Sequence, residues 1–263
     1  MLYAQCYMII LLIFLTRTVF GVDEQTTAST VISTSATSTE NSFQNIDAGT
    51  LAKAINIPTC ESNCTEMLLT KLYGILELKD IFDQWKNLCT EYNQSTACME
   101  QPNHCSHGEI YRILTSGIHY LCIRKEMFFD KNRDCIQPNL DQGAQECDRS
   151  CKMIQSIADL SRKPSVQDAA QKGGNIITVV TELGGVCSAA NCFLPCFRER
   201  MNKKCPRSGG MIVDGILKPF YILAKFLENA TPLVTNIVDE KMPRSCSFLV
   251  KRESLDSIRQ QPV

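Results

Sequence analysis

The segment Cys147-Asp-Arg-Ser-Cys151 carries two cysteines four residues apart, a spacing that recurs in Cys60-Glu-Ser-Asn-Cys64 and Cys192-Phe-Leu-Pro-Cys196. Residues four apart share one face of an α-helix with Cβ atoms about 5–6 Å apart, whereas a disulfide needs Cβ atoms about 3.5–4.5 Å apart. The two cysteines of a pair are therefore not expected to bond to each other, and each should reach a neighbouring helix. Two facing pairs would clamp an antiparallel helical hairpin, for which segments 147–151 and 192–196 are the candidates.

The chain contains 15 cysteines. Cys6 lies in an N-terminal apolar segment that we expect to be removed, which leaves an even number in the exported protein. An even count predicts a disulfide framework and an oxidising compartment. About 135,000 complete pairings are available to such a set, so the connectivity stays open. The predicted disulfide cysteines are Cys60, Cys64, Cys89, Cys98, Cys105, Cys122, Cys135, Cys147, Cys151, Cys187, Cys192, Cys196, Cys205 and Cys246.

Residues 6–15 form an unbroken apolar run. A membrane-spanning helix needs about 20 apolar residues, so this run is too short to span a bilayer and is typical of a signal peptide. Val19-Phe20-Gly21 predicts cleavage after Gly21. Residues 1–5 contain neither Lys nor Arg, which departs from the usual signal and leaves an uncleaved anchor as the alternative. We therefore expect a secreted, extracellular protein with residues 1–21 as its signal peptide.

The rest of the chain changes in composition along its length. Eleven of the seventeen residues from Thr26 to Ser42 are Ser or Thr, and none is aromatic. Such a segment buries too little apolar surface to order itself, and it is either a mucin-like O-glycosylated stalk or an unmodified spacer. The predicted divisions are a disordered Ser/Thr-rich stalk at 22–50, a Cys-rich helical domain at 51–250 with sub-modules 51–141 and 142–250 as a further division, and a flexible tail at 251–263.

The charge balance argues against two classes of partner. The full chain has 27 basic and 28 acidic side chains, and removal of residues 1–21 takes one arginine with them. No strong field then favours nucleic acid or an anionic membrane. No second apolar run reaches the length of a membrane span, so we expect no stable membrane insertion after signal cleavage.

Apolar residues recur at helical period along most of residues 51–250. One stripe runs from Leu68 to Cys89 and is divided near Gly74 and residues 78–80, and a last long stripe covers 212–227 with a kink expected at Pro219. The β-branched segment 176–180 is compatible with a short strand, but it has no evident partner strand, and we interpret it as helix. The predicted fold class is all-α, a disulfide-rich helical bundle preceded by a disordered Ser/Thr-rich segment.

The sequence lacks a recognisable set of catalytic residues. Only three histidines occur, and His119 sits between apolar neighbours on a predicted helix, where a structural role is expected. The cluster His104-Cys105-x-His107 is the one local His/Cys group, and without a Cys-x2-Cys pair we interpret it as a disulfide cysteine beside solvated histidines. We expect no enzyme activity, no cofactor and no metal site.

Three sequons are candidates for N-glycosylation in an exported chain. Asn93, in what the sequence indicates is a polar loop between Cys89 and Cys98, is the preferred site. Asn63 is crowded by neighbouring cysteines, and Asn229 is followed closely by Pro232, which should lower its use.

One part of the chain resembles a known family. The spacing Cys60-x3-Cys64, Cys89, Cys98, Cys105, then Ile113-Leu-Thr-Ser-Gly-Ile-His-Tyr-Leu-Cys122 and Cys135, is similar to the chondroitin proteoglycan 4-type domain of nematode secreted proteins. The resemblance covers roughly residues 60–205 and implies an extracellular protein of the matrix, cuticle or eggshell. It also implies a glycosaminoglycan chain on some members, which prefers an exposed Ser-Gly in an acidic stretch. The two Ser-Gly pairs here, Ser116-Gly117 and Ser208-Gly209, do not fit that requirement.

These patterns favour a secreted, disulfide-stabilised glycoprotein with a structural or interaction role, whose partners are matrix or other secreted proteins. The alternative is an extracellular carrier of lipids or other small apolar ligands, with the apolar stripes 68–88 and 212–227 lining a cavity between helices.

Overall fold

A computed structural model describes residues 46–56, 59–101 and 108–260, and within these ranges every regular element is helical. The predicted all-α, disulfide-rich class is confirmed. The predicted signal peptide and all of the predicted stalk up to residue 45 lie outside the described residues. The elements are α2 (Ala48–Ile55), α3 (Thr59–Ile75), α4 (Ile81–Met99), α5 (Gly108–Leu114), α6 (Ser116–His119), η1 (Tyr120–Arg124), α7 (Glu126–Lys131), α8 (Arg133–Cys151), α9 (Met153–Arg162), α10 (Pro164–Gln171), α11 (Ile176–Thr181), α12 (Gly184–Lys204), α13 (Ser208–Glu228), α14 (Pro232–Lys241), η2 (Arg244–Leu249) and α15 (Arg252–Gln260).

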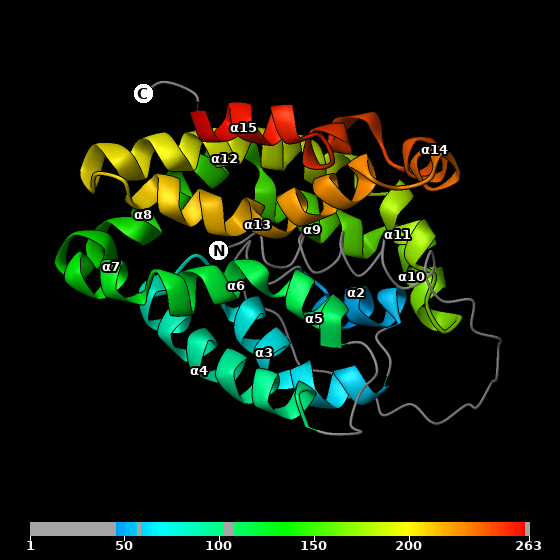
Figure 1. The fold of residues 1–263 in the computed structure, drawn as a ribbon, viewed down its shortest axis with the longest axis horizontal. Helices are drawn as coiled ribbons and strands as arrows, with labels where there is room; N and C mark the ends of the chain where they lie inside the picture. Colours follow the sequence, from blue (N-terminus) through cyan, green and yellow to red (C-terminus); the bar gives the residue numbers. More distant parts are fainter. Residues whose placement is uncertain (1–45, 57–58, 102–107, 261–263) are drawn as a thin grey trace, which may run out of the picture.

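The long helices α12 and α13 lie at one side of the molecule with α8 and α15, and the hairpin of α3 and α4 lies at the other, with α5 and α6 between them (Figure 1). A single cluster of buried apolar side chains runs through both sides. Gly209 allows α13 to approach α12 closely, because a Cβ at this position would lie 2.3 Å from the backbone oxygen of Arg198. Gly215 likewise lets α13 meet Leu121.

The predicted division of the stripe 68–89 is confirmed at a tight turn between α3 and α4. Leu78 and Asp80 adopt positive φ angles of 53° and 50° there. The start of α4 is capped from a distant helix, because Asp141 of α8 accepts hydrogen bonds from the amides of Asp80 and Ile81 at 2.7 and 3.0 Å. This cap fixes the hairpin to α8.

Two further expectations from the sequence can be compared with the helices. Segment 176–180 forms helix α11, as interpreted, and Asn175 caps it by accepting from the amide of Thr178. Helix α13 continues through Pro219 as one element from Ser208 to Glu228.

The predicted sub-modules 51–141 and 142–250 are wrong as structural units. Helix α8 runs without a break across residues 141 and 142. Helix α2, assigned to the first sub-module, packs on α10 of the second, and the amide of Asn175 donates to the carbonyl of Ala54 at 2.9 Å. The sequence could not reveal this, because the contact joins segments far apart in the chain.

The predicted domain limits also need two corrections. Helix α2 begins at Ala48 behind the N-cap residue Asp47, so ordered structure starts before residue 51. Residues 252–260 form α15 instead of a flexible tail, since Leu255 and Ile258 lie on one face of the helix and are 0% and 3% exposed. The segment is otherwise polar, so two apolar residues three positions apart were too weak a signal.

Candidate functional site

Six disulfides join the described helices, with Cα–Cα distances from 5.0 to 5.8 Å. The pairs are Cys64–Cys98, Cys89–Cys122, Cys135–Cys205, Cys147–Cys196, Cys151–Cys192 and Cys187–Cys246. Twelve of the predicted disulfide cysteines are therefore paired. Cys105 and the side chain of Cys60 lie outside the described residues, as do His104 and His107.

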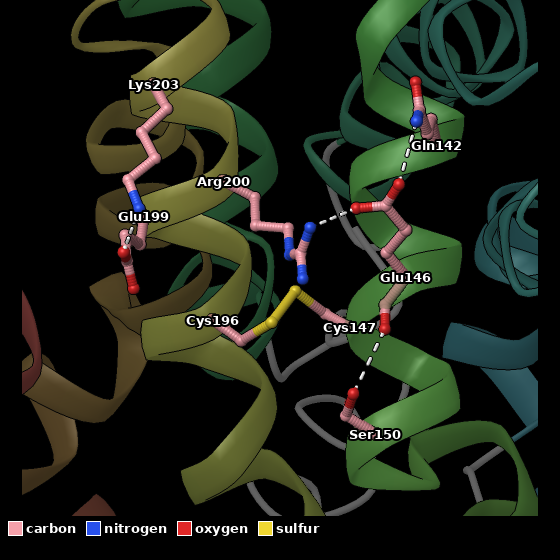
Figure 2. Close-up of polar contacts among 8 residues, drawn as sticks. All are labelled: Gln142, Glu146, Cys147, Ser150, Cys196, Glu199, Arg200 and Lys203. Carbon is pink, nitrogen blue, oxygen red and sulfur yellow. Dashed lines mark hydrogen bonds and ion pairs between the residues drawn. A yellow bond between two sulfur atoms is a disulfide. The ribbon is translucent and has the colours of Figure 1, made fainter.

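Helices α8 and α12 are clamped twice, as their cysteine spacing predicts. Cys147 bonds to Cys196 and Cys151 bonds to Cys192, which confirms the antiparallel hairpin. Figure 2 shows the Cys147–Cys196 bridge beside an ion pair between the same two helices, from Arg200 to Glu146. Both charged side chains are partly exposed, so this ion pair adds little to stability compared with the bridges.

Glu146 also accepts two hydrogen bonds from other residues of α8. Gln142 donates from Nε2 to Oε1 of Glu146 at 2.8 Å, and Ser150 donates to its backbone oxygen (Figure 2). Glu199 and Lys203 instead pair along α12 itself. These polar contacts surround the clamp at the surface, while the sulfur bridges hold the helices together.

Helix α12 is the covalent centre of the molecule. Three of its cysteines and the C-cap residue Cys205 each form a bridge, to α8 in three cases and to η2 in the fourth. Cys187, Cys205 and Cys246 are each no more than 2% exposed. These bridges hold the two ends and the middle of α12, so the surfaces around it are presented by a rigid support.

The string Thr115–Cys122, the most specific part of the sequence resemblance, forms the junction between the two sides of the molecule. It passes from α6 into the π-helix η1 and packs on α13. Thr115 is fully buried and donates from Oγ1 to the carbonyl of Tyr111 at 2.8 Å. At its end, Cys122 bonds to Cys89 of α4.

A polar cluster lies under this junction. The hydroxyl of Tyr92 is 3.3 Å from Nδ1 of His119, and the hydroxyl of Tyr111 is 3.1 Å from Oγ1 of Thr96. The rings of Tyr92 and Tyr111 stack with centroids 6.5 Å apart. Burial is the main reason that the pKa of Tyr111 is raised. His119 therefore contacts a buried tyrosine hydroxyl, and its structural role stays a prediction.

Tyr120, the first residue of η1, carries two cations near its ring. Nζ of Lys125 lies 5.3 Å and Nζ of Lys218 lies 5.8 Å from the ring centre. Burial, together with the charge of Asp214, raises the pKa of Tyr120. Sequence reasoning missed this group, because Lys218 comes from α13 and no local pattern signals a π-helix.

Asp214 is itself engaged by the C-terminal helix. Arg259 of α15 donates to its two carboxylate oxygens at 2.6 and 3.1 Å, and the hydroxyl of Tyr221 donates to Asp256 at 2.6 Å. The hydrogen bond to Asp214 raises the pKa of Arg259, so this guanidinium stays charged. These contacts fasten α15 to α13.

The three sequon asparagines are all exposed. Asn93 lies within α4, so its predicted polar loop is wrong: Asn93 and Gln94 are exposed on a helix whose opposite face buries Tyr92 and Met99. Asn63 lies on α3. Asn229 follows the last residue of α13, in an exposed turn, and donates from Nδ2 to the carbonyl of Lys225 at 2.8 Å. Glycosylation of each stays a prediction.

Neither Ser-Gly pair is presented as a glycosaminoglycan acceptor in the folded chain. Ser208 is 0% exposed and donates to the carbonyl of Cys205 at 2.6 Å. The hydroxyl oxygen of Ser116 is buried, and Gly117 beside it is buried against the junction. Within the described ranges no group of three or more His, Cys, Asp or Glu side chains is arranged to hold a metal ion.

Comparison with known proteins gives one consistent result. The family model of chondroitin proteoglycan 4 matches residues 49–257, which covers nearly all of the described helices. Chondroitin proteoglycan 4 of Caenorhabditis briggsae is 20% identical over 254 residues, covering 76% of this chain and 37% of the relative. Chondroitin proteoglycan 4 of Caenorhabditis elegans is also 20% identical, covering 76% of this chain and 32% of the relative. The chain thus spans about a third of the length of these relatives, and no solved structure matches it.

Proposed function

The chain belongs to the chondroitin proteoglycan 4 family, and on that premise we propose that it is a secreted, disulfide-stabilised glycoprotein with a structural or interaction role outside the cell. The observation that carries this proposal is the covalent fixation of α12 by four disulfides. Such a framework forms and persists in oxidising compartments and is rare in the cytosol. The apolar run at residues 6–15, interpreted as a signal peptide, supplies the route of export.

A rigid helical body that follows a Ser/Thr-rich segment suits a protein that presents surfaces to others. Among the described helices, none is both long enough and apolar enough to cross a membrane. We propose matrix or other secreted proteins as partners, and no nucleic acid, since the charge of the whole chain is close to neutral. If a glycosaminoglycan is attached, its acceptor is neither Ser116 nor Ser208, because both hydroxyls are buried.

A non-catalytic role is part of the same proposal. His119 points its Nδ1 at the hydroxyl of Tyr92, in a cluster that otherwise contains Tyr and Thr hydroxyls. The alternative function, a carrier of apolar ligands, needs the stripes 68–88 and 212–227 to line a cavity. Leu72, Ile216 and Phe220, from these stripes, belong to the packed core, so no specific observation favours the carrier.

The proposal is tested by expressing the full chain in a eukaryotic secretory host and collecting the medium. Free thiols are alkylated before digestion, and a peptide map is made without reduction and with glycans retained. We expect an N-terminus at residue 22, the six bridges described above, and glycan on at least one of Asn63, Asn93 and Asn229. Retention of the chain inside the cell, or several alkylated cysteines in the secreted material, would contradict the proposal.

A variant with Asn229→Gln provides a matched control for the glycan assignment. Asn229 lies in an exposed turn, so its replacement leaves the helices intact and removes one glycan at most. If the mass after digestion with an N-glycosidase still exceeds the mass calculated from the sequence, the excess reports O-glycans. Such an excess would favour the mucin-like stalk over an unmodified spacer.

A further inference from the structure

We propose that Tyr120, Lys125 and Lys218 form a binding surface for an acidic polysaccharide, a chain of sugars that carries sulfate or carboxylate groups. This inference rests on the proposed extracellular function and names a partner class for it. The three residues come from two distant parts of the chain, the π-helix η1 with the residue that follows it, and helix α13. Both ammonium groups lie within 5.8 Å of the same ring centre.

The π-helix η1 positions Lys125 near the ring of Tyr120. Its hydrogen bonds join residues five apart, so Lys125 lies nearer to the face of Tyr120 than the 3.6-residue turn of an α-helix would place it. Short π-helical turns are rare and occur often at functional sites. Cys122, inside the same turn, is bonded to Cys89 of α4, which holds η1 in place. The position of Lys125 is thus set by a fixed backbone.

The two lysines have no acidic partner among the described residues. No ion pair of Lys125 or Lys218 is found there, and their contact is the ring of Tyr120. Asp214, one helical turn before Lys218, has both carboxylate oxygens bound by Arg259. Two cations therefore lie within 5.8 Å of one ring centre without an ion pair to a described carboxylate, a state that favours binding of an anion.

A second aromatic ring in the same molecule has two neighbouring cations whose charges are balanced by carboxylates. The ring of Phe82 also has two cations 5.7 Å from its centre, Lys86 and Arg133. There each cation has a carboxylate, because Lys86 pairs with Asp130 at 3.2 Å and Arg133 lies 4.0 Å from Asp83. The cations at Phe82 serve the fold, and those at Tyr120 are left for a ligand.

Two exposed apolar side chains flank Lys125 in the sequence and favour a polysaccharide over a purely ionic partner. Ile123 of η1 is 46% exposed, and Met127 of α7 is 87% exposed. Tyr120 itself is half-buried. Sugar rings offer apolar C–H faces between their charged substituents, so a single chain could contact the cations and these side chains together.

The test uses the secreted full chain and immobilised dextran sulfate, with affinity measured by biolayer interferometry. Lys125→Gln together with Lys218→Gln is expected to weaken binding about tenfold or more, since contacts with charged groups dominate such an interface. The matched control is Lys86→Gln with Arg133→Gln, which removes the same two units of charge beside Phe82 and is expected to leave the affinity within about twofold. Equal weakening by both double variants would show a general charge effect and overturn the proposal.

Binding measurements with other polymers identify which chemical groups of the ligand are recognised. Hyaluronan carries carboxylates alone, so its affinity relative to dextran sulfate distinguishes carboxylate from sulfate recognition, and neutral dextran should not bind. Binding should vanish in ~1 M NaCl, where the Debye length is about 3 Å. Equal or tighter binding of poly-L-glutamate would assign the surface to acidic peptides and overturn the polysaccharide.

A measurement on the unmodified protein keeps the proposal independent of how the variants fold. Lysine acetylation, read by mass spectrometry, should fall at Lys125 and Lys218 when dextran sulfate is present and stay constant at Lys86. Unchanged acetylation at Lys125 and Lys218 would overturn the inference. A chain that is secreted with its bridges formed but fails these tests would leave the proposed function standing.

Discussion

The α8–α12 pair and the α3–α4 hairpin are both joined by cysteines, but their bridges differ in arrangement. The loop closed by Cys147–Cys196 encloses the loop closed by Cys151–Cys192, and both lie inside the loop of Cys135–Cys205. At the hairpin, Cys64–Cys98 joins α3 to α4 and Cys89–Cys122 joins α4 to η1, and the two loops that they close overlap without nesting. Once an outer bridge exists, a nested one closes only a short additional loop. The α8–α12 bridges are thus partly redundant, and the hairpin bridges are not.

The largest expected effect comes from removing the clamp altogether. Replacing Cys147, Cys151, Cys192 and Cys196 with Ala should lower the free energy of unfolding by about 6 kcal/mol, since both loops open in the unfolded chain. That loss equals the whole stability of many domains. We expect little of this variant in the medium, measured by immunoblot against the wild-type chain. Secretion at the wild-type level, with an unchanged urea midpoint, would show that packing alone holds α8 to α12.

Removing one bridge from each region compares the stability that a nested and a non-nested disulfide contribute. Cys151→Ala with Cys192→Ala should cost about 2–3 kcal/mol, because Cys147–Cys196 still confines the segments four residues away. Cys64→Ala with Cys98→Ala should cost about 3–4 kcal/mol, because no described bridge encloses that loop. Urea unfolding of both purified variants measures the difference. If the nested bridge costs as much as the hairpin bridge, the redundancy argument is wrong.

Two glycines test the packing of the same regions. Gly209→Ala should destabilise by about 1–3 kcal/mol or more, because its Cβ would meet the backbone oxygen of Arg198 at 2.3 Å. Gly74→Ala, in the hairpin, should be neutral or stabilise by up to about 1 kcal/mol, since its Cβ would meet only the side-chain end of Gln84 and Ala is the better helix former. Thermal unfolding measures both. A Gly74 variant less stable than the Gly209 variant would reverse the comparison.

The clamp was predictable from the sequence because its geometry is local. Cysteines four residues apart must point to one side of a helix, and the facing pairs 147/151 and 192/196 complete that arrangement. The bridges Cys135–Cys205 and Cys187–Cys246 carry no such signature, since their partners are set by where α12 ends and where η2 crosses it. Local periodicity likewise predicted the helices from residue 68 to 89, including the turn between them.

The proposed binding surface could not be predicted from the sequence, because it also depends on contacts between segments that are distant in the chain. The sequence around Tyr120 reads as a continuous helix, whereas the structure changes there from α6 to a π-turn, in which Cys122 bonds to Cys89 and Leu121 packs against Gly215. Lys218 is brought to the ring by α13, from nearly a hundred residues away. α15 was missed because its docking on α13 depends on Arg259 and Asp214 as much as on its two apolar residues.

The smallest expected effect is electrostatic and lies beside the α12 region. Glu182, after α11, accepts hydrogen bonds from Lys163 at 2.5 Å and Ser165 at 2.8 Å. The bond from Lys163, followed by that from Ser165, lowers the pKa of Glu182 in the folded protein. A lowered pKa gives stability that is fully present above the unfolded value, about 4.3, and is lost as the pH falls through the folded value.

Glu182→Gln should therefore remove a few tenths of a kcal/mol of stability near neutral pH and progressively less as the pH falls below about 4, because the site is partly exposed to solvent. The measurement is the difference in urea midpoint between wild type and variant across that range, which cancels the titration of all other carboxylates. A difference that grows toward acid pH would mean that the pKa of Glu182 is raised instead. If Glu182→Gln lowered the stability as much as the loss of a single disulfide, surface charge would contribute as much to the α12 region as a bridge does. That result would contradict the expectation that the nested disulfides and the close backbone contact at Gly209 contribute most.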